Sequence, residues 1–483
     1  MSVLTLSLFS YEDDAKLGSS KDEFRLLSLD PAPGSDYNAP LVCNISCHSI
    51  QSPPIFRALS YVWGSSQTPH SVQAGGKHLP ITSSLDEALR HLRTRGGEQA
   101  LTLWIDQVCI NQYNNDEKSD QVALMGSIYS AAERVLVWLG PAADGSDQVM
   151  EMFFEVGLAA KRLEWSSHMK EITRNLRFVG VFRSQGSGGE IDDGLGPFRQ
   201  LIADCLPRFR ELLGAIHEWM KRAWFTRIWV VQEFAMAKNS PAFVCGEGIV
   251  EAELVFLAMD VLLSAHGQLA DAVRSDSSSQ ERKYLATILD DPTALFKDTR
   301  LGRQAFDLGI PGARATLLHV LRDTYVDNDM AMNATDCRDR VFALLGLASD
   351  SAELGLRADY TVRDYGIILA RVAKALIRKT EGLEVLSYSQ FPRQEYKNSQ
   401  IPTWAPDWRS DQTWPLCETR TNHTLFSASG ESPLQMYQTT NEKTLRLEGK
   451  AICTISAWVP NWRGFLLSLS LRLGRRGTFA SQK

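Results

Sequence analysis

The sequence predicts an α/β protein, with a parallel sheet flanked by helices and then a mainly helical C-terminal region with short strands. Two observations lead to this fold class. Between residues 56 and 240, apolar strand-like runs alternate with helical patterns over short connections, which is typical of a parallel sheet. After residue 240, several helical patterns precede a Trp/Pro-rich stretch with short strands.

The composition is that of an ordinary globular protein. The 483 residues include 51 Lys and Arg against 57 Asp and Glu, a formal net charge of −6, and 44% are hydrophobic. This composition is far from that of disordered chains. The mild acidity argues against a nucleic-acid-binding or membrane-surface protein, and no apolar run is long enough for a transmembrane helix.

The cysteines indicate a reducing compartment. The eight cysteines are scattered, and none forms a C-x-x-C pair, which favours buried thiols in a cytoplasmic protein. The N-terminus has no basic region or cleavage site typical of a secretory signal. Cys43, Cys47 and His48 could be imagined as metal ligands. The second ligand pair of a structural zinc site is missing, so we expect a strand there and no metal.

The first elements along the chain are strands. Residues 1–55 are predicted to form a strand-rich extension that packs on the next domain, with strands at 24–29 and 41–50 on either side of a turn-rich stretch. RALSYVWG (57–64) is apolar and aromatic and is ended by a glycine, so it is predicted to be a buried strand.

The next elements complete the predicted alternation. Ser84-x-x-Glu87 resembles a capping box and predicts the start of a helix. The nearly continuous apolar run 101–110 predicts a strand covered on both faces. Asn114 and Asn115 offer N-caps for a second helix, and 134–140 predicts a third strand.

Two site candidates lie near the carboxyl ends of these strands, where ligands bind in parallel α/β sheets. Trp63 follows the first strand, and Asp106 interrupts the second apolar run. A carboxylate there is costly to bury unless it is hydrogen-bonded or functional. Asp106 is therefore either a structural group that fastens its loop or a catalytic group. Cys109 is either a nucleophile or, as we favour without a nearby His, a buried core thiol.

A third candidate is a glutamate on a predicted helix. Glu233 lies one turn beyond Trp229, so the two side chains share a helix face. A carboxylate beside an aromatic wall is partly desolvated, which raises its pKa and suits it to acid–base work. The alternative is a surface ion pair with Arg227, Arg222 or Lys238, and spacing alone favours that alternative.

Residues 241–410 are predicted to form a helical auxiliary region. Asp336–Gly346 predicts a helix with an apolar face, a solvated start with local ion pairs, and a closing glycine. Residues 363–379 predict another helix, and 401–408 a rigid cap over a core. The chain has no P-loop, dinucleotide-binding, metalloprotease or nucleophile-elbow motif, so no cofactor is expected.

Several ordered segments resemble the heterokaryon incompatibility (HET) domain of filamentous fungi and the segments that commonly follow it. The domain-like segments are ALSYVWG (58–64), LWIDQVCINQ (103–112), EKSDQVALMGSIYSAAERVLVWLG (117–140) and RIWVVQEFAMA (227–237). The following segments are TDCRDRVFALLGLA (335–348), ADYTV (358–362) and IPTWAPDW (401–408). The resemblance implies a cytoplasmic fungal protein of nonself recognition, a form of innate immunity in which activation causes growth arrest and programmed cell death.

The resemblance also implies a fold and a chemistry. The family is similar in fold to TIR domains, a flavodoxin-like parallel sheet, and some TIR domains cleave NAD at the nicotinamide–ribose bond with a Glu on a helix. The matching position here is Glu233, with Asp106 as a second acid and Trp63 and Trp229 as aromatic walls for the substrate. NAD would be a substrate and not a cofactor. The alternative is a non-catalytic module that signals by self-association.

The implied partners are therefore proteins of recognition signalling and other copies of the chain, without nucleic acid or a membrane span. Two parts depart from the family pattern. An insertion at about 141–221 separates the third strand from the Glu233 helix, giving a HET domain at 56–240. Residues 411–483 are expected to form short strands and a truncated or altered tail.

Overall fold

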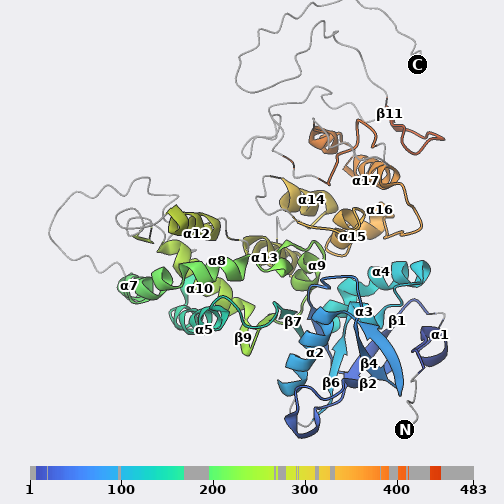
Figure 1. Ribbon diagram of the computed structural model, residues 1–483. Coiled ribbons are helices and arrows are strands. Elements are labelled where there is room, and N and C mark those ends of the chain that lie inside the picture. Colours follow the sequence, from blue (N-terminus) through green and yellow to red (C-terminus); the bar gives the residue numbers. More distant parts are fainter. Residues whose placement is uncertain are drawn as a thin grey trace, which may run out of the picture.

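The fold is known from a computed structural model, which describes residues 7–18, 20–95, 99–167, 195–265, 268–269, 279–289, 291, 293–310, 315–326, 332–380, 382–390, 401–409, 412 and 436–447. In these ranges a nine-stranded sheet occupies the N-terminal half, and helices follow it along the chain (Figure 1). The predicted α/β class is confirmed. The Gly/Ser-rich loop at 184–194 and the tail at 448–483 lie outside the described residues.

Four parallel strands form the centre of the sheet. They are β3 (Arg57–Ser60), β6 (Leu101–Trp104), β7 (Arg134–Trp138) and β8 (Ala242–Cys245). β3 pairs in parallel with β6 on one side and with β7 on the other, and β7 pairs in parallel with β8. The spatial order is therefore second, first, third and fourth strand of the chain. Such an order requires crossovers on both faces of the sheet, as in doubly wound folds.

The rest of the sheet pairs mostly antiparallel, so the predicted parallel sheet accounts only for its central strands. The added strands are β1 (Glu23–Leu29), β2 (Val42–Ser49), β4 (His70–Ala74), β5 (Lys77–Ile81) and β9 (Gly248–Glu251). β1 pairs antiparallel with both β2 and β6, and β4–β5 and β8–β9 are hairpins. The strands of the N-terminal residues thus belong to the same sheet as β3. The strands of these hairpins have only four or five residues, too few for a clear period, which explains why they were not predicted.

Alternation along the strands divides the apolar side chains between the two faces. In β3, Leu59 joins a smaller cluster with the helix α2 (Ser83–Arg95). Ala58 joins a larger cluster that includes α4 (Asn115–Ala131) and α9 (Trp229–Ala235). Side chains on successive strand residues point to opposite faces, so a four-residue strand supplies both cores.

Two helix starts test the predicted caps. Asn114 is the N-cap of α4, as predicted: its side chain accepts hydrogen bonds from the backbone N–H groups of Asp116 and Glu117 at 3.1 Å. The capping box at Ser84 was wrong. The Ser84 hydroxyl instead donates to the Val62 carbonyl at 2.5 Å and ties α2 to the end of β3.

The predicted strand 101–110 was too long. It ends at Trp104, and Asp106–Cys109 form one turn of helix, α3. An apolar run cannot by itself separate a buried strand from a buried helical turn. The correction matters because it places Asp106 at the start of that turn, just beyond the sheet.

The remaining helices fill two regions (Figure 1). They are α1 (Tyr11–Asp14), α5 (Ser146–Arg162), α7 (Gly196–Glu211), α8 (Leu213–Met220), α10 (Ala252–Ser264), α12 (Ser279–Leu289), α13 (Ala294–Asp307), α14 (Leu317–Tyr325), α15 (Asp339–Leu345), α16 (Ser351–Leu354) and α17 (Tyr365–Thr380). The insertion thus supplies α5, α7 and α8, which lie with α10 and α12. A short hairpin, β10 (Met436–Tyr437) and β11 (Arg446–Leu447), follows α17. No helix of the described residues is long and apolar enough to cross a membrane.

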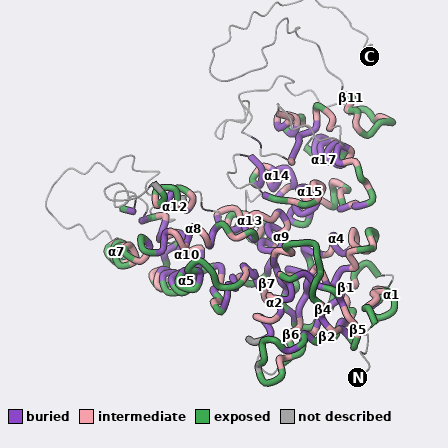
Figure 2. The backbone as a smooth tube through the Cα atoms, in the orientation of Figure 1, coloured by how far each residue is buried: buried purple, intermediate pink, exposed green. Residues whose placement is uncertain are grey.

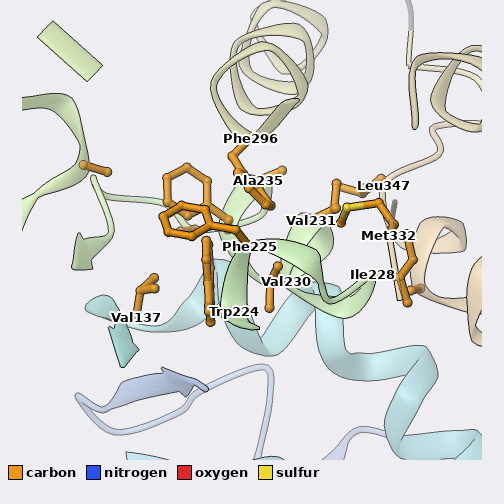
Figure 3. Close-up of a cluster of buried hydrophobic side chains, with 14 of the residues drawn as sticks. Val137, Trp224, Phe225, Ile228, Val230, Val231, Ala235, Phe296, Met332 and Leu347 are labelled. Atoms are coloured by element: carbon orange, nitrogen blue, oxygen red, sulfur yellow. The ribbon is translucent and has the colours of Figure 1, made fainter. Parts of the chain in front are cut away.

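The larger apolar core continues from the sheet into the auxiliary region. Buried backbone runs through both parts in Figure 2. In Figure 3, Trp224 and Phe225 lie beside Phe296 of α13, while Val231 of α9 lies near Leu347. The Trp224 and Phe296 ring centroids are 5.0 Å apart. Residues on either side of position 240 therefore share one core.

The Asp336–Gly346 helix is shorter than predicted, and its charges differ from the prediction. Its apolar side chains are buried, as predicted, but Arg340 is only 8% exposed and not solvated. The Arg340 guanidinium donates to the carbonyls of Met332 and Trp408 and lies 4.3 Å from the centroid of the Tyr325 ring. Burial is possible because these carbonyls and the ring replace the water that the cation loses.

A glycine at a helix crossing gives a first testable prediction. A Cβ added to Gly157 of α5 would overlap the Leu254 carbonyl of α10, whereas a Cβ on Gly302 of α13 meets nothing within 4 Å. We expect Gly157→Ala to lower the free energy of unfolding by about 1–3 kcal/mol through overpacking. Gly302→Ala is the matched control and should raise it by about 0.5–1 kcal/mol. Urea denaturation measures both, and equal effects would contradict the close crossing.

Candidate functional site

The candidate residues gather beyond the carboxyl ends of β3 and β6. β3 ends at Ser60, three residues before Trp63, and β6 ends two residues before Asp106. Because these strands are parallel neighbours, their ends meet at one edge of the sheet. The helix α9 packs against β3 from one face and brings Glu233 to the same edge.

Glu233 belongs to a buried chain of hydrogen bonds. Its side chain is 1% exposed. The Ser60 hydroxyl donates to the Glu233 carboxylate, and the Trp224 indole N–H donates to the Ser60 oxygen at 2.8 Å. The Tyr129 hydroxyl donates to the Leu59 carbonyl at 3.3 Å and lies near the Glu233 carboxylate, whose pKa it lowers. The carboxyl group is thus surrounded by polar groups from a strand, a helix and a turn inside an otherwise apolar core.

The surroundings of Glu233 shift its protonation toward neutral pH. Burial raises the pKa of Glu233 to about 7, while Arg227 lowers it and the Asp106 charge raises it further. The Ser60 hydrogen bond and the nearby Tyr129 hydroxyl lower it. Burial is the largest influence because a charged carboxylate loses its hydration in the core. A carboxyl group with such a pKa can both hold and release a proton near pH 7.

Asp106 is held by its own contacts. The Trp63 indole N–H donates to one Asp106 oxygen at 2.8 Å, and the Gln107 backbone N–H donates to the other at 2.7 Å. Burial raises the pKa of Asp106, whereas Arg227 and the Trp63 hydrogen bond lower it. The Gln107 contact fits the structural alternative for Asp106, in which the carboxylate fastens its own loop. The Trp63 contact joins two of the predicted site residues.

Arg227 affects the protonation of both carboxylates. Its guanidinium donates to the Tyr61 carbonyl, just beyond the end of β3. It lowers the pKa of both Asp106 and Glu233. Among the described residues it makes no direct ion pair with either one, so it acts on both through space. Of the alternatives drawn from the sequence, a direct Arg227–Glu233 pair is therefore not formed.

Trp229 faces a different neighbour. It is half-buried, and its side chain lies beside Asp339 at the start of α15 and lowers the pKa of that carboxyl group. The structure thus brings together Trp63, Asp106 and Glu233, and it directs Trp229 toward the auxiliary region. The aromatic side chain that reaches the Glu233 network is Trp224, which the sequence analysis did not select.

An open hollow of about 630 Å³ adjoins this cluster. Trp63 lines it together with Gly64, His70, Asp86, Glu87 and Arg90. Asp86 is committed to Arg90, which donates to its two oxygens at 2.8 and 3.1 Å. Trp63 therefore lies between a solvent-filled hollow and the Asp106 carboxylate.

Cys43 and Cys109 are core residues, whereas Cys47 is exposed, so the prediction of a buried thiol was wrong for Cys47. Cys109 is buried, and burial raises its pKa to about 12, which suppresses the thiolate that a nucleophile needs. Burial also raises the pKa of Cys43 to about 12. In the part of the chain that the structure describes, no three His, Cys, Asp or Glu side chains are grouped as ligands for a metal ion.

Comparison with known proteins adds two matches. The family model "Heterokaryon incompatibility protein (HET)" matches residues 56–233, a stretch that contains all four candidate site residues. The Neurospora crassa protein "Heterokaryon incompatibility protein 6, OR allele" is 33% identical over 484 aligned positions, which cover 95% of this chain and 68% of that protein. No solved structure matches the chain.

Proposed function

The chain belongs to the heterokaryon incompatibility protein family, and from this premise we propose that it is a fungal effector of nonself recognition whose activation arrests growth and kills the cell. The observation that carries this proposal is the extent of the similarity. The match to the Neurospora crassa incompatibility protein covers 95% of this chain, so it includes the auxiliary region as well as the HET segment.

At the chemical level, we propose that the site cleaves NAD at the nicotinamide–ribose bond within a TIR-like fold. The strand order second, first, third, fourth supports such a flavodoxin-like sheet. Cleavage develops positive charge on the ribose, which a nearby carboxylate stabilises. The specific observation in favour is Glu233, a carboxyl group with a pKa of about 7 at the ligand-binding edge of the sheet.

One observation favours a second candidate function, a non-catalytic module that signals by association with protein partners or other copies. Glu233 is 1% exposed and does not line the hollow beside Trp63. In the conformation described here, a substrate would not reach its carboxylate. NAD cleavage therefore requires an opening of the site, whereas an interaction module does not.

Induced expression in a fungal host, with growth and cellular NAD both followed, tests these proposals. At high expression, where a small open fraction of the chain is enough, we expect the intact chain to arrest growth and deplete NAD. Glu233→Gln should slow NAD loss by about 10²–10³-fold, the usual effect of removing one group that stabilises the transition state. The matched control is Glu133→Gln, a surface glutamate whose side chain is 52% exposed.

The outcomes separate the candidates. Growth arrest with intact NAD would leave the effector function and replace the enzyme with the interaction module. Normal growth with the intact chain at high expression would contradict the effector function. NAD loss that is the same in Glu233→Gln as in Glu133→Gln would remove Glu233 from the chemistry.

A further inference from the structure

The auxiliary region holds the segment that carries Arg227. Asn333 pairs with this segment through its backbone: its carbonyl accepts from Ile228 N–H at 3.1 Å, and its N–H donates to the Thr226 carbonyl at 2.5 Å. These two bonds form a parallel bridge centred on Arg227 and Asn333. The backbone on both sides of Arg227 is therefore fixed by a residue about a hundred positions later in the chain.

A second tie lies two residues after Arg227. The Asp339 carboxylate accepts from the Tyr360 hydroxyl at 2.8 Å, and the Trp229 side chain lies beside it and lowers its pKa. Burial raises the pKa of Asp339, whereas Trp229 and Tyr360 lower it. Asp339 and Tyr360 therefore form a half-buried polar contact of the auxiliary region beside the first residue of α9.

Tyr360 extends this contact to α4. The Lys118 ammonium lies 4.6 Å from the centroid of the Tyr360 ring, and the Tyr360 backbone N–H donates to the Ser119 hydroxyl at 3.5 Å. On the auxiliary side, the Arg338 guanidinium lies 5.1 Å from the same ring centroid and donates to the Tyr360 carbonyl at 2.8 Å. Tyr360 is thus in contact with both the helix before β7 and the segment before α15.

The two ends of α9 are held differently. Val230 through Ala235 are buried, and apolar packing covers them. Arg227 and Trp229, at the other end, are only half-buried and depend on the polar contacts described above. Loss of those polar contacts would therefore loosen residues 226–230 before the rest of α9.

We propose that Asn333, Asp339 and Tyr360 form a latch through which the auxiliary region holds Arg227 between Asp106 and Glu233. A protein partner that draws this part of the auxiliary region aside would release Arg227 and open the edge of the sheet. The latch itself depends only on the contacts above, and its consequence for signalling rests on the proposed function. Under this proposal, Glu233 is buried because the latch keeps the edge of the sheet closed until a partner binds.

Amide hydrogen exchange followed by mass spectrometry tests the latch in the intact chain. The double variant Trp229→Phe with Tyr360→Phe removes the Tyr360 donor and the Trp229 indole N–H beside Asp339, but keeps an aromatic ring at both positions. We expect exchange in residues 226–230 to become at least about tenfold faster, because the polar contacts of a half-buried carboxylate are lost. The matched control is Trp404→Phe with Tyr437→Phe, which removes an indole bond to the Lys443 carbonyl far from α9.

The reference segment is α17, which has no part in the latch. Unchanged exchange in residues 226–230 would overturn the proposal. An equal increase in residues 226–230 and in α17 would also overturn it, because it would show support of the whole fold and not of this segment. Absence of growth arrest in the host would contradict the proposed function and would leave the exchange result valid.

Discussion

A chain that ends at residue 240 is expected to lose its cooperative fold. Such a chain would contain β7 without its parallel neighbour β8, and it would expose the face of α9 that the auxiliary region covers. Exposed apolar surface of this kind destabilises by about 25 cal/mol for each Å². Circular dichroism in the near ultraviolet and urea denaturation, compared with the intact chain, measure the loss.

A single substitution in the intact chain isolates the shared core. Phe296 lies beyond residue 240, and its ring centroid lies 5.0 Å from that of Trp224 and 5.8 Å from that of Phe234. We expect Phe296→Ala to lower the free energy of unfolding by about 3–5 kcal/mol. The control is Phe306→Ala in the same helix, where the ring is 38% exposed and the cost should be below about 1 kcal/mol.

The result decides how the chain is divided. A soluble 1–240 fragment with a sharp unfolding transition would show that residues 1–240 fold without the auxiliary region. Aggregation of the fragment, together with a large effect of Phe296→Ala, would place the HET segment and the auxiliary region in one folding unit. A partner acting on either part would then affect both.

Three of the four central strands could be predicted from the sequence because their apolar runs are long and separated by clear helical patterns. β3, β6 and β7 begin where predicted. The hairpins β4–β5 and β8–β9, which include the fourth central strand, were missed because their strands have only four or five residues, too few for a clear period. The Gly75-Gly76 turn between β4 and β5 was a usable signal, since paired glycines favour two-residue hairpins.

The site was only partly predictable. Asp106 and Glu233 stand out in the sequence because an acid within an apolar run needs an explanation. Ser60 and Trp224 do not stand out, because a small residue in a strand and a tryptophan among aromatics are ordinary core residues. The Ser60–Glu233 hydrogen bond joins positions 173 residues apart, and Trp224 reaches it through Ser60. One sequence gives no information on such a contact. The local helical spacing suggested Trp229 as the aromatic neighbour of Glu233, but Trp229 faces Asp339 instead.

Glu233→Gln is expected to change the pH dependence of stability strongly. Burial raises the pKa of Glu233 from its ordinary value of 4.5 to about 7, so between these pH values the folded chain binds a proton that the unfolded chain has lost. Stability must then fall as pH rises through this window. A tenfold change in a protonation equilibrium corresponds to about 1.4 kcal/mol, so the total loss is about 3 kcal/mol by pH 8.

Glutamine has the shape of the protonated acid but does not ionise. Its amide oxygen can still accept from the Ser60 hydroxyl, so Glu233→Gln should have a small effect at pH 5, where Glu233 is already protonated in the folded chain. At pH 8 the same substitution should raise the free energy of unfolding by up to about 3 kcal/mol, because it removes the cost of a buried charge. Urea denaturation of both chains at pH 5, 6, 7 and 8 measures the difference.

The control for this prediction is a glutamate that is not buried. Glu133→Gln changes a side chain that is 52% exposed, so its effect should be the same at each pH. Parallel stability curves for the intact chain and Glu233→Gln would mean that folding does not shift the pKa of Glu233. The carboxylate would then have to be reached by water or neutralised by Arg227 in the folded chain. Either finding would contradict a closed site in which the latch holds Arg227 near the buried Glu233 and the half-buried Asp106.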